Sequence, residues 1–300
     1  MRTDEWTPPS YADPDAFEER DVAVGSVGGT LVVPRSASGV GVVLLSGGGP
    51  FDRDGTAGPN KPLKDLAWGL AGSLPGGGLG GVASVRFDKP SGQAATMTDE
   101  YVPFAVEAVR RLRDVAERVF VVGHSMGGKV APRVARAVPV DGLVLLAADA
   151  EPMHRAAVRV SRHLASLDPA YADFAAQIER QVAAMDALTA DTPSADLPFG
   201  LPASYWLDLL GYDPVAAAGP LGLPLFIAQG GRDYQVTVAD DLSRWRAGLA
   251  GSPDVTFRVY EADDHMFFPG SGPSGPADYL RPQHVDPDLV ADIAAWLSAR

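Results

Sequence analysis

The stretch VFVVGHSMGGKV (residues 119–130) joins an apolar, β-branched run to a turn of small residues and a helical continuation. It fits two motifs. Gly-x-Ser-x-Gly, made by Gly123, Ser125 and Gly127, is the sharp strand-to-helix turn that exposes a nucleophilic serine. Gly-x-x-x-x-Gly-Lys, ending at Lys129, approximates a phosphate-binding loop. Both motifs need a strand, a tight turn and a helix, so residues elsewhere must decide between them.

The phosphate-loop interpretation has one supporting and one opposing feature. The apolar run GLVLLAAD ends at Asp149, as does the strand that positions magnesium in such proteins. However, Lys129 is followed by Val130, whereas a Ser or Thr hydroxyl is needed there to bind the metal. The nucleophile interpretation is therefore preferred. Lys129 is expected to be a solvated side chain, and no nucleotide, other cofactor or metal ion is expected.

A serine nucleophile needs a general base, and the base needs an acid that orients it. Asp233 follows the apolar run LFIAQG, and His265 follows FRVYE, so Ser125, Asp233 and His265 occur in the chain order of doubly wound hydrolases. They are predicted to be the catalytic nucleophile, acid and base. Asp149, at another strand end, is an alternative acid, and Asp264 is interpreted as a turn residue.

The developing oxyanion needs backbone N–H donors. Gly47, Gly48 and Gly49 follow the run GVGVVLL, where a backbone without Cβ can approach the reacting carbonyl. The charged residues at 52–54 are expected to hold this loop in place. Phe51, in the same loop, is predicted to contact the substrate.

Apolar runs alternate with helical patterns along most of the chain, which predicts an α/β fold. DVAVGS and GTLVVPR, joined at 27–29, predict an antiparallel hairpin. Several of the remaining runs are nearly continuous and apolar, as in strands buried on both faces of a parallel sheet. We expect a mostly parallel, eight-stranded sheet with helices on both faces. The expected strands are 21–26, 29–35, 39–46, 81–88, 118–123, 141–148, 223–230 and 254–261; the expected helices are 61–73, 99–117, 127–138, 237–249 and 286–299.

This alternation stops between residues 150 and 220, where two or three helical segments occur without a strand. The expected organisation is an N-terminal extension (1–19), a core (20–150 and 220–300) and a helical cap insertion (151–219). Phe199 and Trp206, near the end of the cap, are predicted to contact the substrate. The glycine-rich run 73–81 leads into a strand rather than a helix, so it is interpreted as a loop, not a phosphate site.

Composition narrows the functional class. The net charge of −13 argues against nucleic acid and anionic membranes as partners. The absence of cysteine excludes disulfides and thiol catalysis. No apolar run has the length of a membrane span, and the N-terminus lacks the apolar segment of a secretion signal. We expect a cytoplasmic protein that acts on a small molecule; a homo-oligomer is also compatible with the sequence.

On the basis of these residues, the chain resembles the α/β-hydrolase fold family. Within that family it is similar to bacterial carboxylesterases related to dienelactone-hydrolase-like and acyl-thioester-hydrolase proteins. The segments that carry the resemblance are SGGGPFDRDG, VRFDKPSG, GHSMGG, GGRDYQV and DDHMFFPG. The resemblance implies the same triad, with oxyanion donors from the backbone of Met126 and Gly48. The run of three glycines leaves the register open by one residue, so Gly49 is the alternative.

The expected activity is hydrolysis of a carboxylic ester or thioester of a small to medium apolar substrate through an acyl-enzyme. Two alternatives use the same residues. A lyase would eliminate a carboxylate from an acylated biosynthetic intermediate, and a non-catalytic receptor would only bind a ligand on a hydrolase scaffold. The intact Ser, Asp and His set disfavours the receptor.

Overall fold

The computed structural model describes residues 6–72 and 80–300. The first five residues of the predicted N-terminal extension, and residues 73–79 of the glycine-rich run, lie outside this range. Within it, no helix combines the length and the apolar character needed to cross a bilayer.

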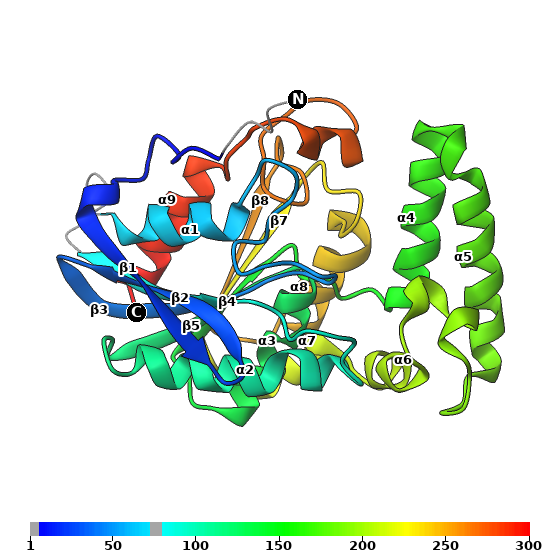
Figure 1. Cartoon of the computed structure of the whole chain (residues 1–300), viewed down its shortest axis with the longest axis horizontal. Helices are drawn as coiled ribbons and strands as arrows, with labels where there is room; N and C mark the ends of the chain where they lie inside the picture. The colour runs from blue at the N-terminus through cyan, green and yellow to red at the C-terminus, as the bar shows by residue number, and fades with distance from the viewer. Residues whose placement is uncertain (1–5, 73–79) are drawn as a thin grey trace.

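A single eight-stranded sheet, with strand order β1-β2-β4-β3-β5-β6-β7-β8, forms the centre of the molecule (Figure 1). β1 pairs antiparallel with β2 and β2 antiparallel with β4, while all the other neighbours are parallel. The expected mostly parallel, eight-stranded sheet is thereby confirmed. The strands are β1 Phe17–Val24, β2 Val27–Pro34, β3 Ala37–Leu45, β4 Gly81–Phe87, β5 Arg118–His124, β6 Gly142–Leu146, β7 Leu225–Gly230 and β8 Val255–Tyr260.

The β1–β2 hairpin is present, but its turn was predicted at the wrong residues. Val24 pairs with Val27, so the turn is formed by residues 25–26, with Gly25 at a φ of 60°. The expected turn glycines instead lie inside β2. A Cβ on Gly28 would come within 2.4 Å of the Arg53 guanidinium. That glycine is therefore needed for the close approach of a side chain rather than for the turn.

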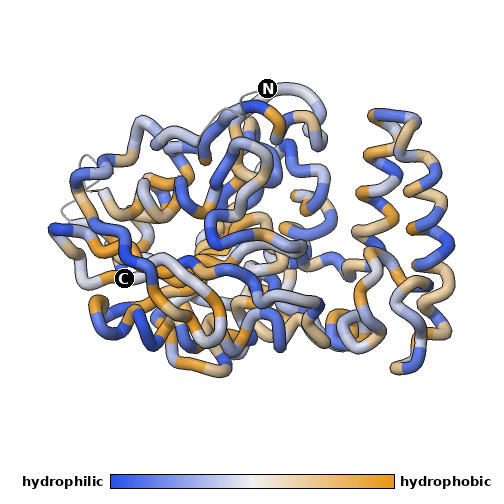
Figure 2. Tube along the Cα trace, in the orientation of Figure 1, coloured by the Kyte–Doolittle hydropathy of each residue, from blue (hydrophilic) through white to orange (hydrophobic). Residues whose placement is uncertain are grey.

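The continuous apolar runs are explained by burial on both faces of the sheet. Along β3, Val43 joins one core cluster and Val42 the other, and Val121 and Val122 of β5 divide in the same way. Successive side chains of a strand point to opposite faces, so a strand covered on both sides has no polar face. Figure 2 shows this apolar character along the central strands.

Helices cover both faces of the sheet (Figure 1). Side chains of α1 and α9 belong to one core cluster, and side chains of α2, α3 and α8 to the other. These helices are α1 Pro62–Ala71, α2 Met97–Leu112, α3 Met126–Ala137, α8 Ser243–Gly248 and α9 Pro287–Ser298. Residues 238–242, at the start of the expected helix 237–249, form a π-helical turn before α8.

Between β6 and β7 the described chain forms helices only: α4 Met153–Leu167, α5 Ala172–Ala184, α6 Ala203–Leu210 and α7 Pro214–Ala218, with short 3₁₀ turns. α4 and α5 pack on each other and stand away from the sheet in Figure 1. We interpret this segment as a cap over the core. At the other end of the chain, β1 begins at Phe17, inside the predicted extension.

Candidate active site

Ser125 lies between β5 and α3 in a strained turn. Its φ of 53° and ψ of −122° are unusual for a residue with a side chain. Neighbouring glycines allow this turn because their backbones touch other backbone. A Cβ on Gly123 would lie 2.3 Å from the Gly127 carbonyl, and one on Gly127 would lie 2.6 Å from the Leu45 carbonyl. The sequence therefore folds into a tight elbow that exposes the serine.

His265 and Asp233 form a buried pair. The Nδ1 atom of His265 is 2.7 Å from Oδ2 of Asp233. The same oxygen accepts a hydrogen bond from Gln229 at 2.9 Å, and Oδ1 accepts from the backbone amides of Gln235 at 2.8 Å and Val236 at 3.0 Å. Four donors thus fix the carboxylate. A donating Nδ1–H leaves the Nε2 lone pair of His265 available as a base.

The electrostatics around His265 favour proton acceptance. Burial lowers the pKa of His265, but the negative charge and hydrogen bond of Asp233 outweigh it, so the pKa is raised. His124 donates from Nε2 to the backbone carbonyl of His265 at 2.7 Å. Burial, reinforced by the neighbouring His265, lowers the pKa of His124 to about 3, so this ring is neutral and positions the loop that carries His265.

The alternative acid, Asp149, has a different partner. Its Oδ2 accepts a hydrogen bond from Lys129 Nζ at 2.9 Å. The expectation that Lys129 is solvated is wrong, because its side chain is only 2% exposed. Asp264, the predicted turn residue, accepts hydrogen bonds on Oδ1 from the amides of Met266 and Phe268, at 2.9 and 3.1 Å. The geometry therefore favours Asp233 as the partner of the histidine.

Tyr101 orients the candidate oxyanion loop. Its buried hydroxyl lies 2.8 Å from the Gly47 carbonyl, to which it donates. A trans peptide sends its C=O and N–H in opposite directions, so the Gly48 N–H points away from Tyr101. A Cβ on Gly48 would lie 3.7 Å from the Cβ of Met126, so Gly48 lies against the first turn of α3. Met126 is the first residue of α3, and its N–H has no partner within the helix.

Gly49 has a different arrangement. Its φ is +104°, and its carbonyl accepts a hydrogen bond from the Phe51 amide at 2.9 Å. The nearest side chain to a Cβ there would be Phe51 rather than the elbow. Of the two registers left open by the sequence, the structure favours Gly48 with Met126 as the donor pair.

Charged residues hold the candidate oxyanion loop, as the sequence suggests. Arg53 pairs with Asp88 at 2.6 Å and donates to the Gly29 carbonyl at 2.8 Å. Asp54 accepts from the buried Arg86 at 2.8 Å. These contacts tie the loop to β2 and β4, so the glycines have a rigid support.

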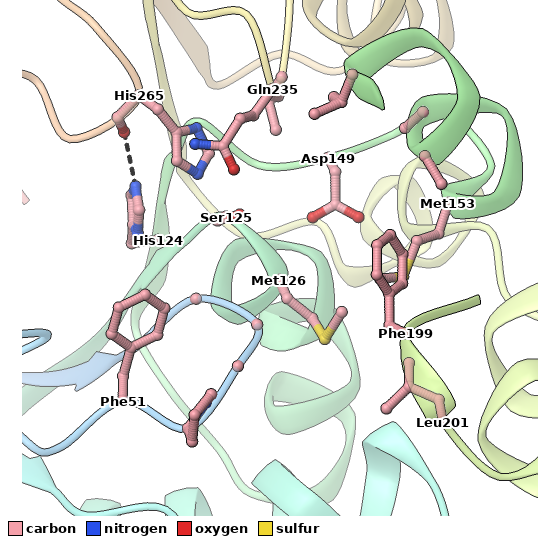
Figure 3. Close-up of a pocket in the computed structure, with 18 of the residues that line it drawn as sticks. Phe51, His124, Ser125, Met126, Asp149, Met153, Phe199, Leu201, Gln235 and His265 are labelled. Carbon is pink, nitrogen blue, oxygen red and sulfur yellow. Dashed lines mark hydrogen bonds between the residues drawn. The ribbon is translucent and has the colours of Figure 1, made fainter. Parts of the chain in front are cut away.

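A cavity of about 1160 Å³ opens above Ser125 and is lined by both the core and the cap segment (Figure 3). His265 lies beside the serine in this view, and Met126 and Asp149 project toward the same space. The wall from the cap segment is mostly apolar. It contains Met153, Ala156, Ala157, Val160, Leu164, Phe174, Phe199 and Leu201.

The three predicted substrate-contact residues have different positions. Phe51 and Phe199 line the cavity. Trp206 does not: its side chain is fully buried, its indole N–H donates to the Pro198 carbonyl at 3.3 Å, and its ring stacks on Phe199 at 6.4 Å. The predicted role of Trp206 is therefore corrected from substrate contact to support of Phe199.

Three supporting residues were not anticipated from the sequence. Tyr101 holds the candidate oxyanion loop, Gln229 holds Asp233, and the Tyr205 hydroxyl on α6 contacts Glu100 and lies 3.2 Å from the Met126 sulfur. Gln229 could have been recognised from the sequence, because it is a polar residue inside the apolar strand LFIAQG. The two tyrosines occupy ordinary apolar helix positions, so only their tertiary partners reveal their roles. Across the described ranges, no three His, Asp or Glu side chains gather into a metal site.

Asp263, two residues before His265, gives the fold a testable pH dependence. Burial, together with the charge of Asp286, raises its pKa to about 8. The folded state therefore holds a proton at pH 7 that an unfolded Asp, with a pKa of about 3.9, has lost. The resulting stabilisation is complete below about pH 4 and is lost as pH rises to about 8, at up to about 1.4 kcal/mol per pH unit.

Asp263→Asn should remove this dependence. Thermal unfolding of both proteins is measured between pH 5 and 9. The melting temperature of the variant minus that of wild type should increase with pH up to about pH 8 and then stay constant. Glu261→Gln, an exposed position in the same loop, is the matched control and should show no such trend. A pH-independent difference for Asp263→Asn would contradict the assigned proton.

Comparison with known proteins identifies the family of this chain. A family model described as "Alpha/beta hydrolase family" matches residues 42–279. Esterase EstD of Thermotoga maritima is 33% identical to the chain over 303 residues, covering 98% of this chain and 70% of that protein. Among solved structures, an esterase of Pyrococcus furiosus superposes with a TM-score of 0.61 at 18% identity, covering 98% of each chain. A thermophilic esterase from Thermogutta terrifontis gives 0.53 at 17% identity, covering 94% of this chain and 98% of the other. The chain belongs to the α/β hydrolase family.

Proposed function

We propose that this enzyme hydrolyses carboxylic esters through an acyl-enzyme formed on Ser125. The single observation that carries the proposal is the buried Asp233–His265 pair, with an Nδ1–Oδ2 distance of 2.7 Å, behind the elbow that exposes Ser125. The 33% identity to Esterase EstD over 98% of the chain supports ester hydrolysis as the reaction of this enzyme.

The proposed mechanism assigns a role to each group. His265 Nε2 takes the proton of Ser125 as the serine oxygen attacks the ester carbonyl. The N–H groups of Gly48 and Met126 stabilise the oxyanion, and the positive end of α3 adds to their effect. His265 then protonates the leaving alcohol and activates the water that releases the acid. Asp233 holds the ring in the required tautomer throughout.

The apolar wall of the cavity supports a small to medium apolar substrate, with Phe51 and Phe199 as proposed contacts. Three statements remain predictions from the sequence: the protein is cytoplasmic, it has no nucleic-acid or membrane partner, and it could form a homo-oligomer. A lyase reaction is the competing outcome, because the same base could remove a proton from carbon.

Turnover of a short-chain aryl ester in ¹⁸O-water separates these reactions. Hydrolysis should place the label in the released acid, while the alcohol keeps its own oxygen, and rapid mixing should reveal an acylated Ser125. If no simple ester reacted, and an acylated substrate gave an alkene and unlabelled acid, the enzyme would be a lyase.

A further inference from the structure

Asp149 lies in the turn that follows β6, and other segments hold this turn rigid. The buried Trp245 donates from its indole to the Ala148 carbonyl at 2.8 Å. Asp241 accepts a hydrogen bond from the Ala150 amide at 2.9 Å. The backbone is thus fixed on both sides of Asp149, and the contact with Lys129 orients its carboxylate before any ligand arrives.

Within the described part of the chain, only one oxygen of this carboxylate has a hydrogen-bond partner. Oδ2 accepts from Lys129, which reaches it from α3. Oδ1 is buried and has no hydrogen-bond partner among the residues of 6–72 and 80–300. Figure 3 shows the carboxylate projecting between Met126 and Phe199, within the cavity that contains Ser125. A buried acceptor without a partner is unfavourable, and it can be satisfied by a ligand that brings a donor.

We infer that Asp149 is a specificity-determining residue whose Oδ1 accepts a hydrogen bond from a hydroxyl group on the ester substrate. This inference rests on the proposed esterase function, and it adds a polar requirement to a substrate that is otherwise apolar. The substrate class is a hydroxylated ester, with the hydroxyl separated from the scissile bond by a short apolar segment.

The charges around the site favour a neutral donor over an ion. Lys129 neutralises Asp149, and the other acid on the cavity wall, Glu100, is paired with Lys89 at 2.7 Å. A ligand cation would share Asp149 with an ammonium already in place. A ligand anion would meet a carboxylate. A hydroxyl fills the remaining acceptor without adding charge to a buried site.

The test compares matched esters on each side of the scissile bond. On the alcohol side, the monohexanoates of ethanediol, propanediol and butanediol are compared with propyl, butyl and pentyl hexanoate, in which a methyl group replaces the hydroxyl. On the acyl side, aryl 3-hydroxyhexanoate and 6-hydroxyhexanoate are compared with aryl hexanoate. Aminoalkyl hexanoates supply the ammonium counterpart. The readout is the kcat/KM ratio of each hydroxylated ester to its alkyl partner.

In the variant Asp149→Leu/Lys129→Met, both charges are removed together, so no buried charge is left without a partner. For at least one pair of esters, the kcat/KM ratio measured on this variant should be about 10- to 100-fold lower than the ratio measured on wild type. This is the usual range for a hydrogen bond to a charged group. Asp149→Asn should give an intermediate ratio. Arg133→Met/Asp208→Leu removes another ion pair of α3, at 2.7 Å and outside the cavity, and should keep the wild-type ratio.

Each other result has a distinct meaning. If esters are hydrolysed but every ratio is the same in wild type and in both Asp149 variants, Asp149 is only a member of a buried ion pair and the inference is overturned. A preference for the ammonium esters that the variants lose would also overturn it, because the ligand would be a cation. Failure of wild type on every ester would overturn the proposed function itself, together with the inference.

Discussion

Replacing Ser125 with alanine should lower kcat/KM for an aryl ester by about 10⁴- to 10⁶-fold, because the acyl-enzyme can no longer form. The folded structure should persist, since alanine differs only by the hydroxyl and Ser125 makes its described hydrogen bonds through its backbone, to Leu146 and Lys129. Initial rates of ester hydrolysis, together with the melting temperature, measure the two effects separately.

A fluorophosphonate probe gives the same test without turnover. Wild type should be labelled at Ser125 and Ser125→Ala should not be labelled. Ser161→Ala is the matched control, because Ser161 also lines the cavity but donates its hydroxyl to the Val158 carbonyl at 3.0 Å. That variant should still be labelled at Ser125. Labelling that survives in Ser125→Ala would exclude Ser125 as the nucleophile.

Asp233→Asn should lower kcat by about 10³- to 10⁴-fold while the protein stays folded. An amide at this position turns an N–H toward Nδ1 of His265 and so favours the wrong tautomer of the ring. The pH profile adds a second readout. Asp233 raises the pKa of His265, so without its charge the pKa should fall, and the ascending limb of kcat should move to lower pH.

Two other carboxylates serve as comparisons for this result. Asp264→Asn changes a buried acid next to His265 that bonds only backbone amides in the described structure, so its effect on kcat should be far smaller. If Asp149→Asn caused the loss of about 10³-fold or more on an aryl ester, and Asp233→Asn did not, then Asp149 would be the acid.

The central part of the sheet could be predicted because strands such as β3 and β5 are buried on both faces, so their apolar runs stand out in the sequence. The chain order of Ser125, Asp233 and His265 could be predicted for a related reason. Ser125 and Asp233 follow such runs, and His265 follows the more exposed edge strand β8. The ends of parallel strands meet at one edge. Both signals are local, so neither depends on knowing how helices pack.

The errors concern side chains whose partners are distant in sequence. Nothing near Lys129 indicates that Asp149, twenty residues away, will neutralise it in a buried position. Trp206 belongs to α6, which is apolar on more than one side: Leu207 and Leu210 are 42% and 44% exposed while Trp206 is buried. Hydrophobicity alone therefore could not tell which side of α6 faces the core and which faces the cavity.

The close contacts around the elbow bear on how this enzyme can change during evolution or directed mutagenesis. A Cβ at Gly123, Gly127 or Gly128 would come within 2.3 to 2.6 Å of other atoms, so almost no substitution there will survive selection. Met153 and Val160 of α4 face the cavity from a helix that stands away from the sheet. Libraries that vary this helix and spare the elbow should yield new substrate ranges while keeping the reaction itself.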